Sequence, residues 1–173
     1  MPDRNLLAAV VHEWTLKAEN DLKTASHTLK LGKECPTDTV CFHAQQCVEK
    51  YLKALLVWRC IRFPKTHSIG ELVRLVPQAG RPGISPEEQE RLTDYAAATR
   101  YPGLYDALSL AAARDAVKLA RRIRRDVRAL LPPKASKRCS YDRVCPVNHR
   151  AVRHVWTVVA ILRLAPVVRV GRR

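Results

Sequence analysis

The clearest hydrophobic pattern in the chain runs from Val40 to Leu56. Apolar residues recur there at three- and four-residue steps, which places them on one broad face of a helix. Asp38 is positioned to cap the start of this helix, and Phe63-Pro64 is expected to end it. A polar stripe borders the apolar face, and such a border is suited to holding a ligand or a partner. The predicted buried face consists of Cys41, Ala44, Cys47, Val48, Tyr51, Leu52, Leu55 and Trp58, and the polar border of His43, Gln46 and Lys50.

Four further segments show helical patterns. A near-heptad repeat of apolar residues predicts a helix over 7–29 that ends at Gly32. Ser68 is expected to cap a short helix over 69–76, and Ser85-Pro86-Glu87-Glu88 is a capping-box start for a helix that reaches about residue 98. The last helix is predicted over 107–131, before Pro132-Pro133. No part of 5–131 alternates with a period of two residues. We therefore predict an all-α fold, an up-and-down bundle of four main helices plus one short helix.

The charge of the chain divides it into two parts. The formal net charge is +15, and residues 132–173 contribute +9 of it, from ten Lys or Arg against Asp142 alone. We therefore predict a helical bundle over 5–131 and an atypical basic C-terminal extension over 132–173, for which we expect disorder or weak structure. A basic chain favours polyanionic partners such as RNA. The alternative is that much of this charge only solvates the outer faces of helices.

Several classes of protein do not fit this sequence. The N-terminal residues do not resemble a signal peptide, so we expect a cytoplasmic protein without a disulfide framework. No apolar stretch is long enough for a membrane span. Cys139, Cys145, His149 and His154 have a spacing that fits no common zinc finger, so we predict no metal site. The sequence contains no P-loop and no dinucleotide-binding fingerprint, and we expect no cofactor.

Several motifs together resemble the HEPN domain family. They are FHAQQ-x-x-EK-x-LKALL over 42–56, Ala18-Glu19-Asn20-Asp21-Leu22, Pro64-Lys65-Thr66-His67-Ser68 and Thr99-Arg100-Tyr101-Pro102. The resemblance extends over about residues 6–131. The resemblance implies a small prokaryotic helical protein that tends to form a homodimer. It also implies pairing with a minimal nucleotidyltransferase as a partner, in a toxin–antitoxin or nucleotide-handling system.

Arg62 and His67 have the Arg-x4-6-His spacing that the resemblance associates with metal-independent ribonucleases. An imidazole with a pKa of about 6.5 can move a proton, and a guanidinium can hold a phosphate as charge develops. In the ribonuclease members, however, the pair opens a late helix, and here it follows the Val40–Leu56 helix. At the late position Arg100 has no histidine after it at this spacing. The catalytic candidates are therefore Arg62, Arg100 and His67. The alternative is that His67 only caps the short helix or binds a backbone carbonyl.

A wider polar surface is the second candidate site. His43, Gln46, Lys50 and Lys53 lie on one helix, and Tyr101 and Tyr105 lie in a later loop. Basic groups suit phosphates and aromatic rings suit bases, so these residues are candidates for nucleotide or RNA binding. The alternative is that Gln46 and Lys50 border a dimer interface and the two tyrosines pack. The sequence thus predicts one of two functions. The first is an RNA-directed protein, in its more specific version a ribonuclease, and the second is a non-catalytic nucleotide- or partner-binding module.

Overall fold

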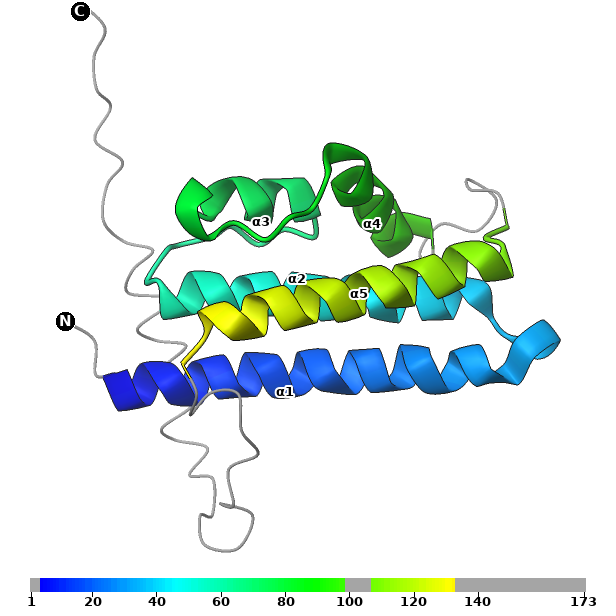
Figure 1. Ribbon diagram of the computed structural model, residues 1–173, viewed down its shortest axis with the longest axis horizontal. Coiled ribbons are helices and arrows are strands. Elements are labelled where there is room, and N and C mark those ends of the chain that lie inside the picture. Colours follow the sequence, from blue (N-terminus) through cyan, green and yellow to red (C-terminus); the bar gives the residue numbers. More distant parts are fainter. Residues whose placement is uncertain (1–3, 99–106, 133–173) are drawn as a thin grey trace, which may run out of the picture. The chain divides into compact units, whose positions relative to one another are not determined.

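The computed structural model describes residues 4–98 and 107–132, and every regular element in these residues is helical. The prediction of an all-α fold is confirmed (Figure 1). The predicted basic extension lies, apart from Pro132, outside the described residues. The α-helices are α1 (Arg4–Thr28), α2 (Thr37–Trp58), α3 (Ile69–Leu75), α4 (Pro86–Ala98) and α5 (Leu110–Leu130), with short 3-10 segments η1 (Leu29–Glu34) and η2 (Gln78–Gly80).

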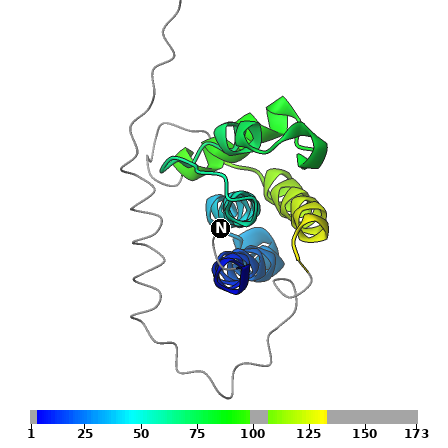
Figure 2. The same cartoon turned by 90° about the vertical axis from the view of Figure 1, so that its left-hand side faces the viewer.

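The other four α-helices are arranged around α2. The long helices α1, α2 and α5 lie side by side, and α3 and α4 cover α2 from the side opposite α1 (Figures 1 and 2). The chain runs along α1 in one direction and along α2 and α5 in the other. Helix α2 contacts all four of the other α-helices, and its most extensive contact is with α1. It is therefore the central element of the domain.

The sequence of α2 explains this central place. Seven of the eight residues predicted to form its apolar face are buried, and Trp58 packs at the edge of the core. Burial also extends beyond that face, since Val40, Ala54 and Leu56 are fully buried. A helix that is apolar on most of its circumference is stable only when other helices surround it.

The predicted start signals of α3 and α4 are confirmed. Ser68 Oγ accepts a hydrogen bond from the Glu71 amide at 3.3 Å. At α4 the capping box is complete, because Glu88 N–H donates to Ser85 Oγ at 3.3 Å and Ser85 N–H donates to Glu88 Oε2 at 3.0 Å. These caps satisfy amide donors that the first turn of a helix leaves without partners.

Two predicted helix starts are wrong in detail. Asp38 does not cap α2 but lies inside its first turn, where its Oδ1 accepts a hydrogen bond from the Thr39 amide at 2.7 Å. Helix α5 begins at Leu110 rather than at residue 107, because Ser109 is its cap and accepts from the Ala112 amide at 3.1 Å. At α5 the neighbouring Ser109 thus takes the capping role, whereas at α2 the residue before the helix is Pro36, whose side chain makes no cap hydrogen bond.

The predicted ends of two helices also need correction. Helix α2 ends at Trp58, five residues before Phe63, because Ile61 N–H donates to Leu56 O and Cys60 N–H donates to Val57 O, both at 2.9 Å. This pair of bonds is a Schellman motif, and it places Cys60 in the left-handed region with φ of 55°.

The first helix ends in two stages. Its α-helical part stops at Thr28, and a 3-10 segment carries the chain on to Glu34. Gly32, the predicted end, interrupts that segment with φ of 60°. No helix in the described residues is long and apolar enough to cross a membrane.

Candidate functional site

A line of polar side chains is buried along α2. Gln45, Glu49 and Lys53 follow one another at four-residue steps and are almost inaccessible to solvent. Glu49 accepts hydrogen bonds from Lys53 Nζ at 2.7 Å and from Gln45 Nε2 at 2.8 Å. Because residues four apart face the same side of a helix, the three side chains form one connected stripe. Lys53 was predicted from the sequence to lie on a polar surface, whereas Glu49 and Gln45 were not predicted as site residues.

The buried stripe holds the segment between α2 and α3. Lys53 Nζ donates to Thr66 O at 3.1 Å, and Gln45 Nε2 donates to His67 O at 3.4 Å. The Lys53 ammonium also lies 5.8 Å from the ring centre of Trp14 and 5.9 Å from that of Phe63, so two aromatic faces flank the charge. The connection between the two helices is therefore fixed by α2 itself.

His67 completes this arrangement. Its Nδ1 lies 3.1 Å from Glu49 Oε2, and half of its side chain (51%) is exposed, whereas only 4% of the Glu49 side chain is. Burial acts to raise the pKa of Glu49, but hydrogen bonds from Lys53, Gln45 and His67 outweigh it, and the pKa lies below its usual value. Glu49 is thus a carboxylate at neutral pH. A buried carboxylate that orients a half-exposed imidazole is an arrangement suited to proton transfer.

The polar border of α2 forms a second cluster around Asp21 of α1. His43 Nδ1 lies 2.9 Å from Asp21 Oδ1, and Lys50 Nζ donates a short hydrogen bond to Asp21 Oδ2. Gln46 Nε2 donates to Gln45 Oε1 at 2.8 Å, which links the border to the buried stripe. All three border residues are half-buried, as their predicted position requires.

The structure therefore divides the predicted site residues into groups. It brings His43 and Lys50 together on Asp21, and Lys53 and His67 together on Glu49. Arg62 has an exposed side chain in the segment between α2 and α3. Arg100, Tyr101 and Tyr105 lie in residues 99–106, outside the described part of the chain.

A third carboxylate, Glu19, joins α1 to α2 and α5. Its Oε1 accepts hydrogen bonds from Arg124 Nε and Arg128 Nη1, both at 2.6 Å, and a short hydrogen bond from the Tyr51 hydroxyl. Burial acts to raise the pKa of Glu19, but these donors outweigh it and the pKa is lowered. Burial also raises the pKa of Tyr51, and Glu19 raises it further, so the phenol stays neutral. No sequence signal singles out this cluster, because Glu19 is one of three acidic residues on α1, with Glu13 and Asp21.

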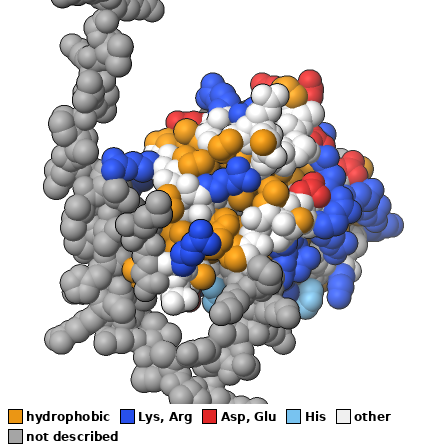
Figure 3. Space-filling view, turned by 60° about the vertical axis from the view of Figure 1, so that its left-hand side comes forward, with side chains coloured by type: hydrophobic (Ala, Val, Ile, Leu, Met, Phe, Trp, Pro, Cys, Tyr) orange, Lys and Arg blue, Asp and Glu red, His pale blue; other side chains and the backbone are white. Residues whose placement is uncertain are grey.

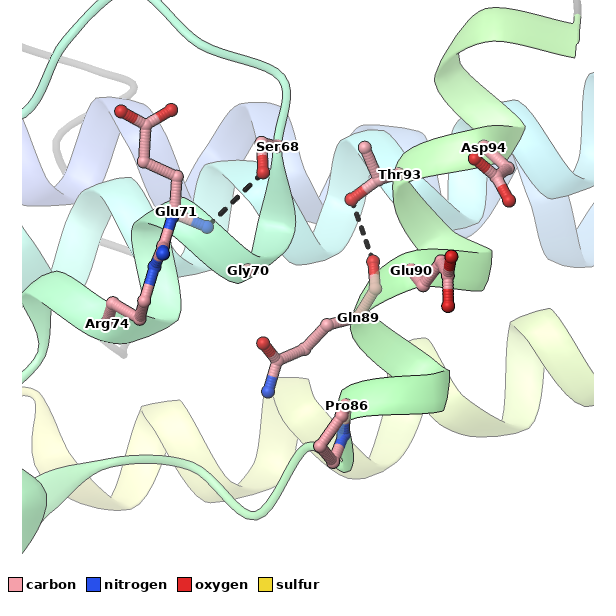
Figure 4. Close-up of a pocket in the computed structure, with 9 residues that line it drawn as sticks. All are labelled: Ser68, Gly70, Glu71, Arg74, Pro86, Gln89, Glu90, Thr93 and Asp94. Carbon is pink, nitrogen blue, oxygen red and sulfur yellow. Dashed lines mark hydrogen bonds between the residues drawn. The ribbon is translucent and has the colours of Figure 1, made fainter.

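One pocket lies apart from these clusters, between α3 and α4 (Figure 4). Its volume is about 400 Å³, and three carboxylates and one guanidinium line it. None of the predicted site residues is among those that line it. The lining residues are Ser68, Gly70, Glu71, Arg74, Pro86, Gln89, Glu90, Thr93 and Asp94.

In the described residues, no three His, Cys, Asp or Glu side chains come together in a group that could hold a metal ion. Four further Cys and His residues, whose spacing fits no common zinc finger, lie outside the described residues: Cys139, Cys145, His149 and His154. Of the cysteines in the described residues, Cys41 and Cys47 are buried in the core, as predicted. Burial raises the pKa of the Cys41 thiol to about 12, so this group is not a thiolate nucleophile at neutral pH.

Comparison with protein families gives one decisive finding. The sequence model of the HEPN domain family matches residues 11–130, which include all five α-helices except the first turns of α1. The chain belongs to the HEPN domain family. The three of these motifs that lie in the described residues are also joined in space, since Asp21 of the 18–22 motif binds Lys50 of the 42–56 motif, and Glu49 of the 42–56 motif binds His67 of the 64–68 motif. Polar contacts of these three HEPN motifs thus tie α1, α2 and the segment before α3 together.

Two solved structures are similar to this HEPN domain. TT1696 from Thermus thermophilus is 28% identical, with a TM-score of 0.58, and the match covers 70% of this chain and 98% of that chain. ST0689, described as an archaeal HEPN homologue, is 26% identical, with a TM-score of 0.52 and coverage of 69% and 96%. The matched region is thus almost the whole of each neighbour. A comparison with curated proteins gives no match.

Proposed function

We propose that this HEPN domain protein acts on RNA and that His67 carries a proton in metal-independent cleavage of the phosphodiester backbone. The observation that supports this proposal is the contact between His67 Nδ1 and the buried Glu49 carboxylate. With Nδ1–H donated to Glu49, the carboxylate fixes the tautomer and orientation of the ring and stabilises the imidazolium that forms when the ring takes a proton. The half-exposed side chain is within reach of a ribose hydroxyl or a leaving oxygen of a bound strand.

The second requirement is a cation that holds the phosphate. Arg62 is the candidate in the described residues, because it is exposed and lies in the same connecting segment as His67. Arg100, from the late loop, is the other candidate that the sequence provides. A guanidinium in either position would stabilise the additional negative charge on the phosphate in the transition state.

A specific observation favours a second function, a non-catalytic nucleotide- or partner-binding module. His43, Lys50 and Lys53 already have carboxylate partners, Asp21 and Glu49. A phosphate would have to compete with these carboxylates for the basic side chains. In a non-catalytic module the network instead fixes the shape of the α2 border. The border would then present Gln46 and Lys50 to a protein partner.

The partners expected from the sequence belong to this proposal. They are a second copy of the chain, bound partly through α2, and a minimal nucleotidyltransferase in a toxin–antitoxin pair. The exposed part of α2 is narrow, because His43, Gln46 and Lys50 are half-buried and the opposite side of the helix is in the core. Light scattering of the purified protein at micromolar concentration tests the homodimer, and a monomeric mass would contradict it. Co-expression with the nucleotidyltransferase and joint purification test the heteromeric pair.

The test of the main proposal compares two histidine variants on total RNA in the presence of EDTA. His67→Ala should lower the cleavage rate by about 100-fold or more, the usual contribution of a general acid or base. His27→Ala is the matched control, because His27 is an exposed histidine on α1, and it should cleave at the unchanged rate. Equal cleavage by both variants would exclude His67 as the proton carrier. RNA binding without cleavage by the unchanged protein would favour the non-catalytic module.

A further inference from the structure

The basic residues of α5 fall into two groups that the sequence does not distinguish. Three of them point to carboxylates of other helices, since Arg124 and Arg128 bind Glu19 and Arg122 binds Glu88 at 2.6 Å. The other four are exposed and follow one another at three- and four-residue steps, which places them on a single outward stripe. These four are Arg114, Lys118, Arg121 and Arg125.

Helix α1 extends this stripe. Arg121 Nη2 donates to Ser26 Oγ at 3.1 Å, which brings the outward face of α5 beside α1. Lys23 lies three residues before Ser26 on the same side of α1, and Lys30 follows in η1, where the chain continues from the end of α1; both are exposed. We call the four residues of α5 together with Lys23 and Lys30 the basic surface. Figure 3 shows Lys and Arg side chains gathered at the right of the molecule, the side on which α5 lies in Figure 2.

The charges of the basic surface remain available to an anionic ligand. Lys118 pairs with Asp115 at 3.2 Å and Arg125 with Asp126 at 3.3 Å, but about three quarters of each basic side chain is exposed, 75% and 76%. Exposed pairs of this kind contribute little free energy and exchange readily for another anion. The pairs that would be costly to break are those of the three inward arginines.

We propose that the basic surface binds the phosphate backbone of a nucleic acid strand. The stripe from Arg114 to Arg125 is about 16 Å long at the rise of a helix, which is long enough to follow more than one phosphate of a strand. None of the six residues is aromatic, so the surface offers no ring for a base to stack on, and the proposed contacts are to phosphates, which carry no sequence information. The surface belongs to α5 and α1, whereas His67 lies after α2, so it holds the strand at a place separate from the proposed chemistry.

The test uses two full-length variants with the same loss of charge. The first replaces Arg114, Lys118 and Arg125 by Gln, and leaves Arg121 because it also bonds Ser26. The control replaces three exposed basic residues outside the surface, Lys17, Arg74 and Arg91, by Gln. Affinities of fluorescein-labelled single-stranded RNA and DNA of one sequence are measured by anisotropy between about 50 and 200 mM KCl.

The first variant should bind about tenfold more weakly at about 100 mM salt, and its salt slope should be smaller by about 2, because three phosphate contacts to a single strand are lost. The control should stay within about twofold of the unchanged protein. The affinities for RNA and for DNA show which strand the surface prefers. A loss of affinity for either strand in the first variant, but not in the control, supports the inference. Equal losses in both variants would mean diffuse charge, and no binding of either strand by the unchanged protein would also overturn it.

This inference rests on the proposed function only in that both involve a nucleic acid strand, and the two fail separately. His67→Ala should lower the cleavage rate by about 100-fold or more and leave this binding unchanged. A protein that binds through the basic surface but never cleaves would refute the ribonuclease proposal alone. A protein that cleaves at the same rate and binds with the same affinity after loss of Arg114, Lys118 and Arg125 would refute this inference alone.

Discussion

Replacing Glu49 by Gln tests how much the buried polar network of α2 stabilises the domain. The substitution keeps the shape of the side chain and its position beside Gln45, but it removes the negative charge that faces Lys53 at 2.7 Å. Only 10% of the Lys53 side chain and 4% of the Glu49 side chain are exposed. The variant therefore leaves an ammonium ion without its counter-charge in a nearly dry environment.

The expected loss follows from that burial. Removing one partner of a buried ion pair costs about 3–5 kcal/mol. Lys53 keeps its hydrogen bond to Thr66 O and its two aromatic neighbours, so we expect the lower end, about 3 kcal/mol. The unfolding equilibrium constant should then rise by roughly 100-fold.

A double-mutant cycle separates the ion pair from the remaining contacts. Lys53→Met alone leaves Glu49 with Gln45 and His67 as donors, and it should cost about 2 kcal/mol. The combination of Glu49→Gln with Lys53→Met removes both charges and should cost less than the sum of the single variants, by about 2 kcal/mol. Urea unfolding followed by circular dichroism at pH 7 measures all four free energies.

The pH dependence gives an independent check with a defined sign. Because the pKa of Glu49 is lowered in the folded protein, its contribution to stability is present above the unfolded pKa of about 4.3. It is lost as the pH falls through the lower, folded pKa. The difference in free energy of unfolding between the unchanged protein and Glu49→Gln should therefore shrink below about pH 4. A loss smaller than about 1 kcal/mol at pH 7, or strict additivity in the cycle, would show that the ion pair is not a structural element.

Three further outcomes follow from the backbone and the packing. Cys60→Gly should raise the free energy of unfolding by about 0.5–1 kcal/mol in thermal melts, because Cys60 has a positive φ in the Schellman motif, and a decrease would contradict this reading. Gly80→Ala should lower the melting temperature, since its Cβ would lie 1.9 Å from Nη2 of Arg59, and the loss should largely disappear in an Arg59→Ala background. Ending the chain after Pro133 should leave the helical signal and melting temperature nearly unchanged, because the described core lies within 11–131, and a large loss would show that the extension completes it.

The fold was readable from the sequence because its main signal is repeated many times. The apolar face of α2 has many members, and the capping residues Ser68 and Ser85 each mark a helix start by a local mechanism. The errors lie where a local signal had a competitor. Pro64 was a strong stop signal, but the chain had already turned at Cys60, a residue type that seldom adopts a positive φ.

The candidate site was only partly readable, for a different physical reason. His43, Lys50, Lys53 and His67 were identified as basic groups, but the carboxylates that organise them come from α1 and from the buried side of α2. A buried charge looks, in a sequence, like an exposed one. Periodicity alone placed Glu49 among the polar positions of a helix, and only the packing of α3 and of the segment before it shows that this position is covered.

The direction of the helices has a consequence for how the two ends of the domain can be used. Helix α1 begins and α5 ends at the same end of the bundle, and Figures 1 and 2 agree on this. The opposite end carries η1, where the chain passes from α1 to α2. A short linker can therefore join the two ends of the domain. Attachment of the helical domain to a solid support through the start of α1 or the end of α5 likewise leaves the η1 end facing the solution.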